Sequence, residues 1–197
     1  MITIRMNDAA ADALGFPSQD DLRLAGIDAA DVQRLLITGG IERNDHGVLF
    51  VPGLSFESSD PLHHHVDLTG AECSANSWHL EDHPDVHVTI DDNAVPHIGH
   101  DHQIHMLRQG VVLSGIVHAL SRRLPDRPPV RCITAANATN GTFRFHQIRP
   151  GEDWAAVDDL DRYTNEMIVV IDASPPSETT TNIAPKSRPT RSGTYPD

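Results

Sequence analysis

Residues 35–53, LLITGGIERNDHGVLFVPG, decide how the N-terminal part of the chain is interpreted. The apolar beginning of this stretch is typical of the end of a helix, and Gly39 and Gly40 stop that helix. Residues 40–43 and 47–52 then alternate like two short strands, and the Asn-Asp-His-Gly run between them is a favourable tight turn. We therefore expect a helix followed by a β-hairpin.

Three short helices are expected before this hairpin. Residues 6–14 form the first, and residues 17–26 form the second, with Ser18 as its N-cap. Residues 28–40 form the third, in which Asp28 caps an apolar stripe at helical spacing. Three helices followed by a two-stranded hairpin is the order of a winged helix-turn-helix, which places its third helix in the major groove of DNA.

Residues 15–53 resemble the N-terminal domain of AbiEi-type antitoxins, the antitoxin and autorepressor of type IV toxin–antitoxin systems. The family's run is a helix ending in Ala-Gly, a capping residue, a basic helix ending in Gly, a strand with Arg, then Gly-Val-Tyr and Pro-Gly. The matching positions here are Ala25, Gly26, Asp28, Gly39, Ile41, Arg43, Gly47, Val48, Pro52 and Gly53. A weaker similarity to the family's next segment extends to about residue 90.

The resemblance implies a non-catalytic transcriptional regulator that binds operator DNA through residues 28–38 and the wing at 42–47, with a cognate toxin or other protein as partner. The residues expected to contact DNA are Gln33, Arg34, Thr38, Arg43, Asn44 and His46. The family's third helix is usually rich in arginine, whereas this one keeps only Arg34, and phosphate neutralisation supplies most of the non-specific affinity for DNA. The alternative is therefore a protein-interaction or assembly component that keeps the winged-helix fold without DNA binding.

The remainder of the chain indicates a second, mixed domain. Its expected elements are helices at 67–80, 100–124 and 152–163, a strand at 86–91, a hairpin at 130–135 and 142–148, and a buried strand at 167–173. The expected fold class is α+β: a winged helix-turn-helix domain at 1–54, a mixed α/β domain at 61–173, and a flexible tail at 174–197.

Charge is segregated along the chain, whose formal net charge is -13. Between Arg43 and Arg108 there is no Lys or Arg, while eleven acids and eleven of the thirteen histidines fall in that interval. Residues 108–149 reverse this pattern, with seven arginines against one acid, Asp126. These arginines suit a nucleic acid or an acidic partner, or they pair with the chain's own acidic segments at 81–92 and 152–161; we favour the second reading.

Residues 62–67, 78–88 and 96–105 concentrate potential metal ligands, because imidazole with carboxylate suits zinc and similar divalent ions, and the histidines at 97, 100, 102 and 105 lie close together. Their spacing matches no hydrolase signature such as HExxH. A metal-dependent enzyme is thus the least favoured class, a pH-responsive segment is another reading, and a solvated polar surface is the preferred one. The sequence predicts no cofactor and no metal site.

The two cysteines, Cys73 and Cys132, lie far apart in the sequence and are expected to be buried free thiols rather than a metal-type pair. No apolar run approaches the roughly 18 residues that a membrane helix needs. The N-terminus lacks a hydrophobic signal core, so the expected location is the cytoplasm.

Overall fold

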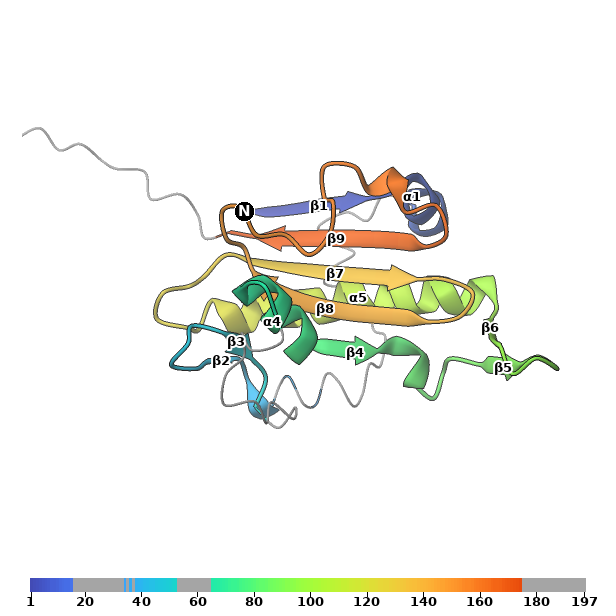
Figure 1. Ribbon diagram of the computed structural model, residues 1–197, viewed down its shortest axis with the longest axis horizontal. Helices are drawn as coiled ribbons and strands as arrows, with labels where there is room; N and C mark the ends of the chain where they lie inside the picture. The colour runs from blue at the N-terminus through green and yellow to red at the C-terminus, as the bar shows by residue number, and fades with distance from the viewer. Residues whose placement is uncertain (16–33, 35, 37, 53–64, 175–197) are drawn as a thin grey trace, which may run out of the picture.

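The computed structural model of the chain describes residues 1–15, 34, 36, 38–52 and 65–174, and it is built around one antiparallel sheet (Figure 1). The five strands of this sheet lie in the order β1-β9-β7-β8-β4. They are β1 (Ile2–Met6), β4 (Ser77–His79), β7 (Val130–Ala136), β8 (Gly141–Gln147) and β9 (Met167–Ala173). This order places the first described strand beside the last one.

β7 lies at the centre of the sheet, and nearly all of its residues are buried. It pairs with β8 over its whole length, from Val130↔Gln147 to Ala136↔Gly141, and with β9 along its other edge. Asn137 shapes the turn between β7 and β8, because its Oδ1 accepts hydrogen bonds from the amides of Thr139 and Asn140. The structure confirms the expected hairpin and the expected buried strand at 167–173.

The N-terminal strand β1 was not expected from the sequence. It pairs with β9 from Ile2↔Ala173 to Met6↔Val169. Asn7 then caps helix α1 (Asp8–Leu14) by accepting a hydrogen bond from the amide of Ala10, and its Nδ2 donates to the carbonyl of Glu166. The predicted first helix therefore begins two residues later than expected, because residues 2–6 complete the edge of the sheet.

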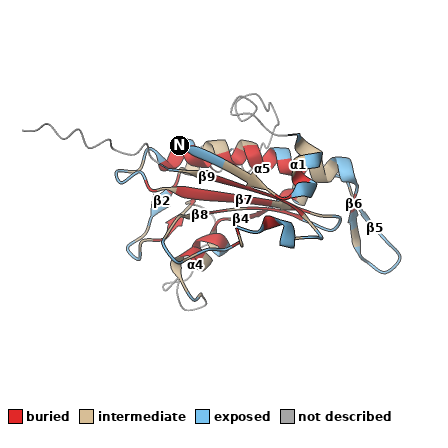
Figure 2. Cartoon of the chain, turned by 90° about the horizontal axis from the view of Figure 1, so that it is seen from above, coloured by how far each residue is buried: buried red, intermediate tan, exposed pale blue. Residues whose placement is uncertain are grey.

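The long helix α5 (His100–Ser121) covers one face of the sheet, and α4 (Leu68–Ala75) lies on the opposite side (Figure 2). Gly110 of α5 packs directly on the side chain of Thr134 in β7, and no space remains there for a β-carbon. The helix expected at 100–124 is confirmed with an earlier end, because the turn before Pro125 closes it.

The other face of the sheet is covered by an irregular segment instead of the acidic helix expected at 152–163. Only the 3-10 turn η2 (Leu160–Arg162) is helical there. Ala155, Val157 and Leu160 pack against Ile133, Ile168 and Val170 of the sheet. The expectation of a helix was wrong because the segment folds as successive turns that place its buried residues on the sheet. The sequence expectation at 67–80 was also partly wrong: α4 ends at Ala75, and the next residues form edge strand β4, followed by the 3-10 turn η1 (Leu80–Asp82).

Two short hairpins lie outside the main sheet (Figure 1). One is β2 (Glu42–Arg43) with β3 (Leu49–Phe50), as expected from the turn sequence, and the other is β5 (Val88–Ile90) with β6 (Pro96–Ile98). Leu36, Ile41, Leu49 and Val51 belong to the same hydrophobic cluster as the residues under α5. Among the described residues, both sides of the predicted boundary at residue 54 therefore share one core.

The coarse fold class is confirmed, since the chain combines helices with antiparallel sheets. Arg34, Leu36, Thr38 and Gly39 are helical, as expected for the end of the third helix. The expected second helix, Gln33 and the tail beyond residue 174 lie outside the described residues.

Candidate functional site

The residues expected to contact DNA lie on the hairpin β2–β3 and the helical residues before it. Arg34 and Thr38 are exposed, and the Thr38 hydroxyl donates to the Arg34 carbonyl at 2.7 Å. Arg43 ends β2, and Asn44 and His46 lie in the turn between the two strands. The structure thus places the described members of the predicted set around one hairpin and the helix end that leads into it.

The turn of the hairpin is held by Asn44. Its Oδ1 accepts hydrogen bonds from the amides of His46 and Val48, each at 3.0 Å. Gly47 adopts a φ of +84°, which a residue with a side chain adopts only under strain. Asn44 is therefore a structural residue of the turn, and the side chains of Asp45 and His46 are exposed.

Arg43 is already engaged within the molecule. Its Nη1 donates to the carbonyl of Gly47 at 2.8 Å, and its Nη2 donates to Asp126 Oδ2 at 2.8 Å. Asp126 lies in the turn between α5 and β7, so this ion pair joins the hairpin to the C-terminal end of α5. The Arg43 side chain remains 29% exposed, and that of Asp126 is 56% exposed.

A buried ion pair fixes the same hairpin to the main sheet. The carboxylate of Glu72, in α4, is fully buried and accepts two hydrogen bonds from Arg149, at 2.5 and 2.9 Å. It also accepts from the backbone amides of Leu49 in β3 and Gln147 in β8. Asn76 adds a donor to the Leu49 carbonyl at 2.8 Å. One carboxylate therefore connects three elements.

Arg149 keeps its positive charge in this anchor. Burial by itself lowers the pKa of Arg149, but the hydrogen bonds and negative charge of Glu72 outweigh burial and raise it. A bidentate arginine–carboxylate pair fixes both distance and orientation. The hairpin is thus held in one position relative to the sheet.

Six of the seven arginines of residues 108–149 fall into two groups, and the seventh, Arg108, is exposed on α5. Arg131 pairs with Asp153 and Asp172, Arg149 pairs with Glu72, and the guanidinium of Arg144 lies 5.5 Å from the centre of the Trp154 ring. Arg131 thus pairs with the expected segment 152–161 through Asp153, whereas Asp172 and Glu72 lie outside the two expected acidic segments and Arg144 contacts an aromatic ring. The second group is exposed near the end of α5 and consists of Arg122, Arg123 and Arg127.

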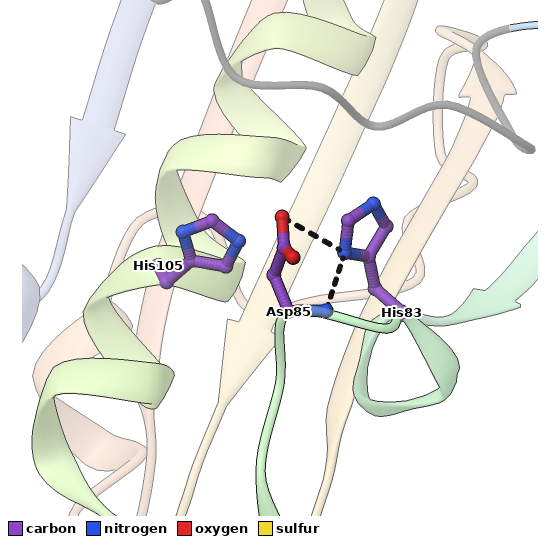
Figure 3. A group of neighbouring side chains, drawn as sticks. All are labelled: His83, Asp85 and His105. Carbon is purple, nitrogen blue, oxygen red and sulfur yellow. Dashed lines mark hydrogen bonds and ion pairs between the residues drawn. The ribbon is translucent and has the colours of Figure 1, made fainter.

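A cluster of ligand-type side chains lies at the other end of α5 (Figure 3). One nitrogen of His83, one nitrogen of His105 and a carboxylate oxygen of Asp85 all lie within 4.8 Å of one another. The Asp85 carboxylate is located between the two rings, and its Oδ2 is 3.9 Å from His83 Nδ1. The two ring centres are 6.1 Å apart. Burial, reinforced by the neighbouring charge of His83, lowers the pKa of His105.

Of the histidines at 97, 100, 102 and 105, only His105 belongs to this cluster. The ring of His102, one turn earlier, lies tilted beside that of His87 with ring centres 6.3 Å apart. His97 and His100 are exposed. His83 and Asp85 belong to the ligand-rich run at 78–88, but spacing along one helix did not indicate that they meet His105, because they come from the loop before β5.

The two cysteines are buried free thiols, as expected. Burial raises the pKa of both thiols far above the ordinary range, so neither supplies a thiolate nucleophile. Within the residues that the structure describes, no helix combines the length and apolar character needed to cross a membrane.

One family model matches the chain over residues 6–184, and its description is the uncharacterized protein PM0498 family. The chain belongs to the PM0498 family. No curated protein and no solved structure matches it. The region shared with the PM0498 family includes both hairpins, the Glu72–Arg149 anchor, the exposed arginines and the histidine cluster. The resemblance of residues 15–53 to AbiEi-type antitoxins remains a prediction from their sequence.

Proposed function

We propose that this chain is a non-catalytic, antitoxin-like regulator that binds operator DNA through a winged-helix surface. The supporting observation is the ion pair between Arg43 and Asp126, because it joins the β2–β3 hairpin to the turn that carries Arg122, Arg123 and Arg127. The hairpin is therefore tied to a segment that carries three exposed arginines, two of which, Arg122 and Arg127, also line a pocket with Met1 and Ala173.

This composite surface has the properties that phosphate binding requires. Three exposed guanidinium groups lie on a short segment, and arginine binds phosphate in bidentate geometry. The buried Glu72–Arg149 pair holds the hairpin in place, so little conformational entropy is lost when the turn meets a duplex. The contacts expected from residues 28–38 add sequence readout in the major groove.

A protein-interaction component is the second candidate, and a specific observation favours it. The Arg43 guanidinium is already bonded to Asp126 and to the Gly47 carbonyl, and the adjacent Glu42 and Asp45 are exposed. Acids at the wing repel phosphate and suit a basic protein partner. A toxin or an assembly subunit is such a partner.

DNA binding at low ionic strength separates the two candidates. Fluorescence anisotropy with a duplex from the chain's own upstream region should show binding that weakens in Arg122→Ala/Arg123→Ala. The variant Arg108→Ala/Arg162→Ala removes the same charge from exposed positions away from the hairpin and is the matched control. Loss of two phosphate contacts should lower the slope of log affinity against log salt by about two.

Two results would overturn the proposed DNA contact. One is the absence of binding to any duplex at low salt. The other is an equal loss of affinity in the two double variants, which would assign binding to net charge alone.

A further inference from the structure

We propose that His83, Asp85 and His105 form a binding site for a divalent cation of the zinc class. The site is independent of the DNA surface, because it lies at the N-terminal end of α5, whereas the arginines lie at the C-terminal end. Two imidazoles and one carboxylate are a ligand set that zinc and related borderline cations accept, with a fourth position open to water.

The distances fit a site that closes on its ion. Ligand atoms in tetrahedral zinc sites lie about 2.0–2.2 Å from the metal and hence about 3.4 Å from one another. The three candidate atoms here lie within 4.8 Å of one another, so a contraction of at most about 1.4 Å completes the geometry. The Asp85 side chain is 65% exposed and has room for this movement.

The two imidazoles direct nitrogen lone pairs toward the cluster. His83 Nδ1 accepts a hydrogen bond of 3.2 Å from the amide of Asp85, so its lone pair faces Asp85, and coordination of a metal replaces this bond. His105 Nε2 is buried and has no hydrogen-bond partner among the described residues. A buried polar atom without a partner is unfavourable, and coordination of a cation satisfies it.

The local charge also favours a cation. There is no Lys or Arg in the sequence between Arg43 and Arg108, and the one ion-pair partner that the described structure gives Asp85 is His83. A bound divalent ion supplies positive charge beside Asp85, whose ion-pair partner among the described residues is a histidine.

A cation at this position connects the two ends of the β5–β6 hairpin. Asp85 lies three residues before β5, and His105 lies in the second turn of α5, which follows β6 directly. The hairpin projects from the body (Figure 2), and Ile90 in it is 63% exposed. Coordination therefore fixes the base of a projecting hairpin to the long helix.

The test uses full-length protein without an affinity tag, stripped with a chelator and titrated with Zn²⁺ by calorimetry. The titration is performed in a background where His63, His64 and His65 are alanine, because a run of three histidines chelates metal by itself. One Zn²⁺ per chain is expected in this background. His105→Ala should weaken binding by roughly 100-fold or more, and Asp85→Asn should weaken it at least tenfold, since even residues that only orient a ligand are worth 10- to 100-fold.

His97→Ala is the matched control, since His97 is an exposed histidine of the same hairpin outside the cluster. Zn²⁺ should also slow amide hydrogen exchange in residues 88–98 of the background protein and leave it unchanged in His105→Ala. Circular dichroism of each variant establishes that it is folded. The proposal is overturned if the background protein binds no Zn²⁺, or if His97→Ala and His105→Ala lose equal affinity.

Discussion

The hairpins β2–β3 and β5–β6 are similar in sequence pattern but differ in how the body of the protein holds them. In β2–β3, Val48, Leu49 and Val51 are fully buried, and both backbone groups of Leu49 bond to side chains of α4. In β5–β6, Ile90 and Val95 are exposed, and the amide of Ile98 bonds to the carbonyl of Ala138. Strand propensity forms each hairpin, whereas a distant buried carboxylate decides which one is fixed.

Among the changes that test this comparison, loss of the Glu72 charge should have the largest effect on the free energy of unfolding. Glu72→Gln leaves the buried Arg149 guanidinium without its counter-charge, and breaking a buried pair in this way costs about 3–5 kcal/mol. Urea unfolding at pH 7 measures the change in the free energy of unfolding. Asp92→Asn makes the same carboxylate-to-amide change on the exposed turn of β5–β6 and should leave stability within about 0.5 kcal/mol of wild type. Equal effects of the two substitutions would show that Glu72 does not distinguish the hairpins.

Mild acid should lower the free energy of unfolding of the protein, while the hydrogen bonds of the β5–β6 turn persist. Burial lowers the pKa of His118, under the sheet, to about 4, against about 6.5 in an unfolded chain. Between these values the unfolded state binds more protons than the folded state, so stability falls as pH falls from 6.5 to 4, by about 3 kcal/mol. The turn of β5–β6 should persist in this window, because hydrogen bonds from the Val95 and Asn93 amides lower the pKa of Asp91.

Urea unfolding at a series of pH values, with amide signals of Asn93 and Val95 as local probes, measures both parts of this prediction. In His118→Gln the pH slope should decrease by the His118 contribution. The remaining slope has the same sign, since burial also lowers the pKa of His146. An unchanged slope in the variant would assign the acid sensitivity to other groups.

Local patterns in the sequence were sufficient for much of the fold. The turn residues predicted the hairpin around Gly47, and helical spacing predicted α5. Strand β1 was missed because its pairing partner β9 lies more than 160 residues away and nothing local marks that pairing. The segment at 152–163 has helical composition, but packing of Ala155 and Val157 under the sheet outweighs it.

The candidate sites were predictable only in part, for the same reason. Arg43 was identified from its place in the wing, but Asp126, its partner, is 83 residues away. Histidine enrichment indicated metal-binding potential, while the actual neighbours of His105 come from the loop before β5. Glu72 carried no signal at all in the sequence, since a single acid in a short helix is ordinarily exposed.

The Arg43–Asp126 pair should have the smallest effect on stability and the most informative effect on function. The pair is partly exposed, and such pairs contribute about 0.2–1 kcal/mol, so Asp126→Asn should change the free energy of unfolding by less than about 1 kcal/mol. The same substitution removes the one carboxylate among the exposed arginines and frees Nη2 of Arg43, while Nη1 keeps its hydrogen bond to the Gly47 carbonyl. If the surface binds DNA, duplex affinity at low salt should therefore rise, and the salt slope should steepen by about one phosphate contact. If the wing instead binds a basic protein, removal of Asp126 weakens that surface and leaves duplex binding absent. A rise in affinity thus supports the proposed regulator, and unchanged absence of binding in both wild type and variant argues for the interaction component.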